Sequence, residues 1–170
     1  MPYPEEVNKK LIGIYEDMIW LASRPHNTEA RARAWYSQVW SGALKRQVRL
    51  FSGRVSRAAA ADVNGSLCLE HYERLAARIT ELLNQQFVNS IVDHREFLAL
   101  IEECEQVNIT TDHENHAIQV ARGDYGVAGI ELFDWLLLSI ENRQILFNRK
   151  IRGQVANANE YIPRINTNVC

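Results

Sequence analysis

Apolar residues recur along most of this chain at steps of three and four positions, the spacing typical of amphipathic helices. Residues 4–22 carry the clearest stripe, which consists of Val7, Leu11, Ile14, Met18 and Leu21. A second stripe begins at Asn27 or Thr28 and continues to Phe51. It fits either one long helix or two short helices that meet near Gly42, because glycine weakens a helix interior. Both segments are predicted to be helical, each with one buried face.

The rest of the chain follows the same spacing. Ser66 and Asp93 precede apolar-periodic runs as helix caps, and Thr111 and Glu114 have the spacing of a capping box. Further helices are predicted at residues 56–63, 66–92, 93–104, 111–123, 127–140 and 142–153. Strand-type alternation and hairpin turns are not evident. The pattern therefore predicts an all-α fold, a single-domain bundle of seven or eight helices.

Charge divides this chain into two parts. Residues 24–57 hold eight basic residues against one acid, a net charge of +7, and residues 62–141 hold fifteen acids against four arginines, a net charge of −11. The whole chain of 170 residues carries only −2. We therefore expect one helical domain over residues 1–153, with basic N-terminal helices in 1–57 and an acidic bundle in 62–141, followed by an irregular tail at 154–170. An acidic surface favours a cationic partner, although the acids would equally suit solvated helix faces.

Residues suited to catalysis or metal binding do not form a recognisable pattern. His113 and His116 are three apart and could supply half a metal site, but an exposed polar first turn of a helix explains them equally. The Glu-x-x-His pairs of helical di-metal proteins and the glycine loops of nucleotide-binding proteins are absent from the sequence. Cys68 and His71 share a helical face, but the apolar spacing around Cys68 favours core packing. The sequence predicts no enzyme, no metal and no cofactor.

The basic segment 24–57 interleaves cations with aromatic residues such as Trp35 and Trp40. Cations neutralise phosphates and aromatic faces stack on bases, so this segment could bind nucleic acid. The residues that would do so are Arg31, Arg33, Lys45, Arg46 and Arg49. The same cations could instead pair with the acidic half of the chain. A coat-like or regulatory nucleic-acid-binding protein is therefore the alternative function.

A glycine-rich turn connects two of the predicted helices. It reads Gly123-Asp124-Tyr125-Gly126-Val127-Ala128 and continues as Glu131-Leu132-Phe133-Asp134-Trp135-Leu136. Gly123 is expected to end a helix in a left-handed conformation, and Asp124 to cap the next one. The stretch from about 108 to 142 resembles the helical bacterial immunity proteins of the Maf type and of contact-dependent growth inhibition. Asp124 replaces a glutamate and Gly129 a larger residue of that pattern.

The resemblance implies a cytosolic immunity protein that binds a bacterial toxin, most often a basic nuclease, and occludes its active site. Such a protein does no chemistry. The expected partner-binding residues are the densest acids and one aromatic residue: Glu102, Glu103, Glu105, Asp112, Glu114, Asp124 and Tyr125. A cytosolic location also suits the three cysteines, which are an odd number at unrelated spacings. Membrane spans are not expected, because the sequence holds no run of 18 apolar residues.

Overall fold

The computed structural model describes residues 3–39, 42–71 and 75–163, and it shows a mixed α/β fold. The described residues form eight α-helices and a four-stranded sheet, so the all-α prediction is wrong. The helices are α1 (Glu5–Ala22), α2 (Glu29–Val39), α3 (Gly42–Val48), α4 (Arg57–Ala61), α5 (Leu75–Asn89), α6 (His94–Cys104), α7 (Asp112–Val120) and α8 (Ile140–Leu146). The strands are β1 (Leu50–Ser56), β2 (Leu67–His71), β3 (Gln106–Thr111) and β4 (Leu132–Asp134).

Contacts divide the described residues into two units. The N-terminal unit takes residues from 1–48 and 73–105, and the C-terminal unit takes residues from 49–72 and 106–170. Each unit is therefore made of two separate segments of the chain. Whether residues 1–153 behave as one domain stays a prediction. Among the described residues, no helix combines the length and the apolar character that a membrane crossing needs.

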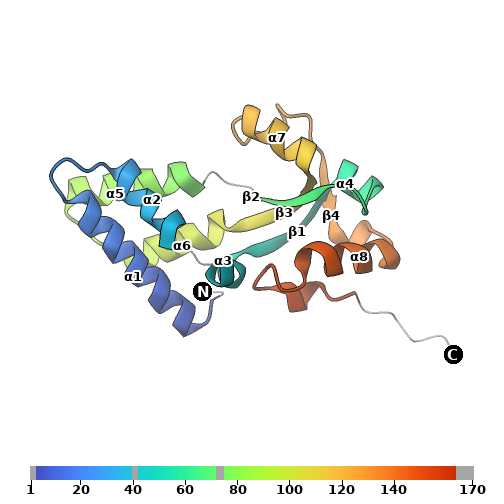
Figure 1. Ribbon diagram of the computed structural model, residues 1–170, viewed down its shortest axis with the longest axis horizontal. Helices are drawn as coiled ribbons and strands as arrows, with labels where there is room; N and C mark the ends of the chain where they lie inside the picture. Colours follow the sequence, from blue (N-terminus) through green and yellow to red (C-terminus); the bar gives the residue numbers. More distant parts are fainter. Residues whose placement is uncertain (1–2, 40–41, 72–74, 164–170) are drawn as a thin grey trace. The chain divides into compact units, whose positions relative to one another are not determined.

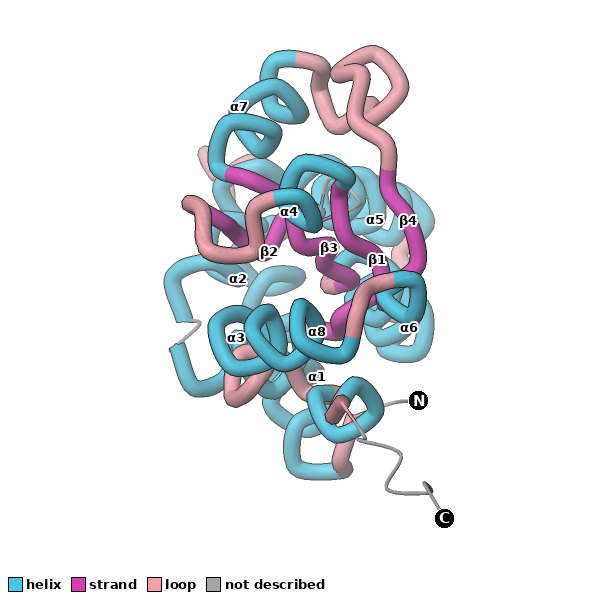
Figure 2. The backbone as a smooth tube through the Cα atoms, turned by 90° about the vertical axis from the view of Figure 1, so that its right-hand side faces the viewer, coloured by secondary structure: helices cyan, strands magenta, loops and turns pink. Residues whose placement is uncertain are grey.

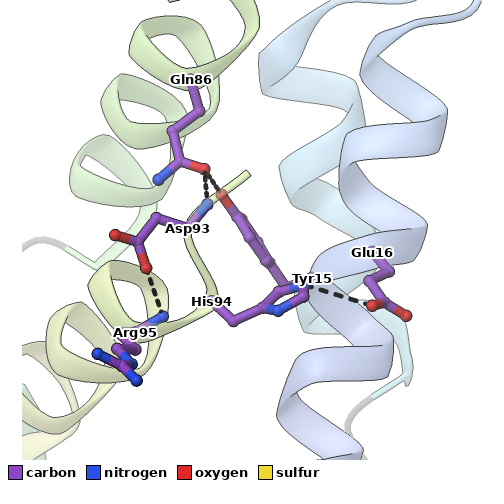
Figure 3. A network of polar contacts seen from close by, with 6 residues as sticks. All are labelled: Tyr15, Glu16, Gln86, Asp93, His94 and Arg95. Atoms are coloured by element: carbon purple, nitrogen blue, oxygen red, sulfur yellow. Dashed lines mark hydrogen bonds and ion pairs between the residues drawn. The ribbon is translucent and has the colours of Figure 1, made fainter. Parts of the chain in front are cut away.

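The N-terminal unit is built from amphipathic helices. The predicted stripe of α1 is confirmed, because Val7, Leu11, Ile14 and Met18 are all buried. A polar network joins α1, α5 and the start of α6 (Figure 3). The buried amide of Gln86 accepts hydrogen bonds from the Tyr15 hydroxyl and, at 2.8 Å, from the backbone N–H of Asp93.

The C-terminal unit contains the sheet, in the strand order β2-β3-β1-β4. Strands β1 and β3 run parallel, and the other two pairs are antiparallel. One face of the sheet is apolar: Phe51, Val55, Val107 and Ile109 pack in one cluster with Leu146 of α8. Helices α7 and α8 lie on opposite sides of the sheet (Figures 1 and 2).

Strands β1, β2 and β4 replace segments that the apolar spacing assigned to helices, whereas β3 lies between two predicted helices. Strand β1 begins within the predicted helical stripe that ended at Phe51, and β2 occupies the start of the helix predicted from Ser66. The helix predicted over 127–140 is instead a set of turns, then β4, then a 3₁₀ turn at Trp135–Leu137. A 3₁₀ turn repeats every three residues, so Trp135 and Leu138 are buried together and imitate a helical stripe.

Several local predictions are confirmed. Asp93 caps α6 by accepting from the backbone N–H groups of Arg95 and Glu96. Thr111 and Glu114 form the expected capping box at α7. These caps were predictable because a cap needs only the residues next to it.

Candidate functional site

The predicted acidic partner surface is divided between the two units. Glu102, Glu103 and Glu105 belong to the N-terminal unit, whereas the remaining residues belong to the C-terminal unit. Glu105 is 4% exposed, and its carboxylate accepts a hydrogen bond from the Tyr36 hydroxyl at 3.0 Å. Burial and this carboxylate together raise the pKa of Tyr36. Glu103 is exposed and pairs with Arg78 at 3.1 Å. Glu105 is therefore buried in the N-terminal unit, although it lies in the densest run of acids in the sequence.

The three predicted acids of the C-terminal unit also bond to their own chain. Glu114 accepts from the Ser56 hydroxyl at 2.5 Å in addition to its capping bonds. Asp112 accepts from the Ser66 hydroxyl. Asp124 accepts from the backbone N–H of Val127 at 2.9 Å and so closes a turn. These contacts give Asp112, Glu114 and Asp124 a structural role, and a role in partner binding stays a prediction.

The predicted nucleic-acid residues lie on α2, on α3 and, for Arg49, directly before β1. Arg31, Lys45 and Arg46 are exposed, and Arg49 is half-buried. Arg33 lines a shallow cavity of about 630 Å³ between α2 and α5, together with Glu29. Trp40, one of the expected stacking residues, lies outside the described part of the chain. Three exposed cations on α2 and α3 leave the nucleic-acid alternative open.

Metal binding finds no support in the geometry of the described residues. They contain no group of three or more His, Cys, Asp or Glu side chains close enough to hold a metal ion. His113 and His116 are both exposed on α7. They have no third ligand among the described residues.

The second face of the sheet is polar, which the sequence did not suggest. Cys68 stands opposite Thr110, and Glu70 stands opposite Asn108, in the β2–β3 ladder. Asn108 is 1% exposed, and both ends of its amide are bonded. Its oxygen accepts from the Ser52 hydroxyl at 2.5 Å, and its nitrogen donates to the Tyr125 hydroxyl at 2.9 Å. Burial raises the pKa of Glu70 and of the Cys68 thiol.

A groove opens on this polar face where β1 is irregular. Phe51 pairs with Val107 and Val55 with Ile109, so three residues of β1 stand opposite the single residue Asn108. Gly53, at the middle of this bulge, has a φ of +78°. The groove has a volume of about 570 Å³ and is lined by Ser52, Arg54, Gln106, Asn108, Tyr125 and residues 130–132. Bulges occur often beside binding sites because they redirect side chains.

Residues 123–131, here called the strap, form one wall of this groove. Asp124 closes the first turn of the strap, and the N–H of Ile130 donates to the carbonyl of Tyr125 at 2.9 Å. The far end is fixed by Arg57, which makes two hydrogen bonds of 2.9 Å to the Glu131 carboxylate. Arg57 also lowers the pKa of Glu131. Both ends of the strap are therefore held by hydrogen bonds to residues of the same unit.

A second feature of this unit is an exposed apolar patch directly after β4. Leu136 and Leu137 are 70% and 76% exposed, and Ile140 is 41% exposed. Asp134 caps the 3₁₀ turn that presents the two leucines, by accepting from the N–H of Leu136 at 2.7 Å. Trp135 of the same turn is buried, and the centroid of its ring lies 5.4 Å from the centroid of the Phe51 ring. Asp134 and Glu141 flank the patch as exposed acids.

Comparison with protein-family models, with curated proteins and with solved structures finds no match for this chain. The glycine turn that carries the resemblance to immunity proteins is formed in part as predicted. Gly123 has a φ of +90°, and Asp124 caps the following turn. The helix expected after the turn is absent, as described above. The resemblance stays a prediction.

Proposed function

We propose that this chain is a binding protein that docks a basic protein partner through the patch Leu136, Leu137 and Ile140, and that it acts as an immunity protein against a bacterial toxin. The observation that carries the proposal is the pair of adjacent, largely exposed leucines between two acids. Interfaces with an apolar centre and a charged rim are typical of specific protein partners. The segment 131–141 holds three acids and no Lys or Arg, so its charge favours a cationic partner.

The two exposed leucines are large enough to supply a substantial part of the binding free energy. Full burial of a leucine side chain contributes about 2 kcal/mol. At exposures of 70% and 76%, burying both leucines would contribute about 3 kcal/mol, or on the order of a hundredfold in affinity. Hot spots of this kind are few in any interface, so a small patch can dominate binding. We therefore expect the contact at residues 134–141 rather than at Glu105 or Glu114, which bond internally.

The test uses a basic toxin encoded next to this chain, with association measured by surface plasmon resonance at two salt concentrations. We expect Leu137→Asp to weaken binding by tenfold or more and to reduce protection of cells that express the toxin. Val88→Asp is the matched control, because Val88 is 73% exposed on α5 of the other unit. Equal loss in both variants, or unchanged binding by Leu137→Asp, would contradict the proposal.

A gel-shift assay with nucleic acid at two salt concentrations tests the nucleic-acid alternative. Phosphate contacts weaken steeply as salt rises. A gel-shift signal that disappears between low and moderate salt and is removed by Arg46→Glu would favour nucleic acid. Retention of that signal in Leu137→Asp would then show that the leucine patch has no part in it.

A further inference from the structure

We infer that the groove between the β1 bulge and the strap binds a small carboxylate attached to an apolar body. The inference does not depend on the proposed protein partner, because the groove is lined by different residues. Its volume of about 570 Å³ lies within the range of pockets that hold small molecules. The lining combines hydrogen-bonding groups with the half-buried apolar side chains of Ile130 and Leu132.

The charge of the groove is set by Arg54. Two charged residues line it, Arg54 and Glu131. Glu131 is already neutralised by two hydrogen bonds from Arg57. Within the described residues, Arg54 makes no ion pair. A guanidinium without a carboxylate partner at the edge of a groove favours an anionic ligand group, and its flat fork matches a carboxylate.

One acid stands near enough to compete with the ligand. Asp134 is the cross-strand neighbour of Arg54 in the β1–β4 pair. Its carboxylate accepts from the N–H of Leu136 at 2.7 Å and is thereby held in a capping role. Since Asp134 still lowers the positive potential around Arg54, Asp134→Asn is expected to strengthen anion binding.

The groove is also organised before a ligand arrives. Ser52 and Tyr125 are both bonded to the buried amide of Asn108. The backbone N–H of Arg54 donates to the Ser52 hydroxyl at 3.1 Å, which fixes the strand where the arginine leaves it. Groups that are held in place lose little entropy on binding, so a weakly concave site of this kind can still select its ligand.

The carboxylate could belong to a free organic acid or to the C-terminus of a peptide, and two pairs of probes distinguish them. The first pair is 4-methylpentanoate and 4-methylpentanamide, and the second is N-acetyl-leucine and N-acetyl-leucinamide. Calorimetry on the full chain should show at least one acid binding tenfold or more tightly than its own amide. Preference confined to the first pair assigns a free acid, and preference confined to the second assigns a peptide terminus.

Three variants test whether Arg54 supplies the positive charge that binds the carboxylate. Arg54→Gln should remove the preference for acid over amide, and Arg54→Lys should keep part of it because the charge remains. Arg57→Gln releases the Glu131 carboxylate beside the groove and should weaken acid binding severalfold while amide binding is unchanged. Arg46→Gln, an exposed arginine of α3, is the control and should change nothing. Equal binding of acid and amide by the unmodified chain, no binding of either, or an acid preference that survives Arg54→Gln would overturn the inference.

Discussion

Replacing Gln86 by leucine tests whether the polar network of the N-terminal unit holds its helices together. Gln86 is 4% exposed on α5 and accepts from the Tyr15 hydroxyl and from the N–H of Asp93. It also donates to the Glu96 carboxylate at 2.7 Å. Leucine has a similar volume but no acceptor, so the variant leaves the hydroxyl of Tyr15, a fully buried residue, without a partner.

The magnitude follows from these contacts. A buried donor without a partner costs about 1–3 kcal/mol, and the N–H of Asp93, which is an exposed residue, adds a smaller amount. We expect Gln86→Leu to lose about 2–3 kcal/mol of unfolding free energy. In a chain of this size that corresponds to a fall in Tm of roughly 4–12 °C. The assay is scanning calorimetry at neutral pH.

Two further variants make the reasoning refutable. Gln85→Leu is the matched control, because Gln85 is exposed on the same helix and bonds only weakly, to Glu81 at 3.4 Å. Tyr15→Phe should cost less in the Gln86→Leu background than alone, since the hydroxyl then has no acceptor to lose. Indistinguishable Tm values for Gln86→Leu and Gln85→Leu, or strictly additive effects of the pair, would show that the network does not stabilise the unit.

Three more predictions concern other parts of the chain. Burial raises the pKa of Glu70, so folding favours its neutral form, and stability is lost as the pH rises through the folded pKa. Glu70→Gln should therefore have a higher Tm than the unmodified chain at pH 7 and the same Tm at about pH 4. An equal Tm difference at both pH values would refute the proposed effect of burial on Glu70. Gly123→Val should lower the free energy of unfolding by about 1 kcal/mol or more, because the φ of Gly123 is +90°. Gly13→Ala in α1 should raise it by about 0.5–1 kcal/mol, because beyond the neighbouring backbone of its own helix no atom lies within 4 Å of the added carbon. Chemical denaturation measures both changes. Chelation should leave the circular dichroism spectrum unchanged; loss of helical signal would reveal a metal requirement.

Local signals in the sequence predicted local structure well. The caps at Asp93 and Thr111 and the left-handed Gly123 each depend on a few neighbouring residues, and all three are present. The strands were missed for identifiable reasons. In β1, the buried Phe51 follows the buried Val48 of α3 by three positions, so it extends the helical stripe into the strand. In β2, the apolar residues Leu67 and Leu69 directly precede the apolar stripe of α5 and so read as its first turns.

The candidate groove could not have been predicted in the same way. Ser52, Asn108 and Tyr125 are separated by 56 and 17 positions, and their hydrogen bonds depend on the parallel pairing of β1 with β3. A signal did exist in β3, where apolar Val107 and Ile109 alternate with polar Asn108 and Thr110. That alternation is only four residues long, the shortest run that indicates a strand, and it lies between two predicted helices.

The contacts of the acids also change the interpretation of the opposite charges of the two halves. Acids such as Glu103, Glu105 and Glu131 bond to residues of their own unit and so contribute to folding rather than to an outward field. With a net charge of −2, the chain offers a distant partner little long-range attraction. Steering by Asp134 and Glu141 would act only within a Debye length, about 8 Å at physiological salt. If a basic partner docks at the exposed leucines, its dissociation rate should therefore respond more strongly to Leu137→Asp than its association rate does to salt.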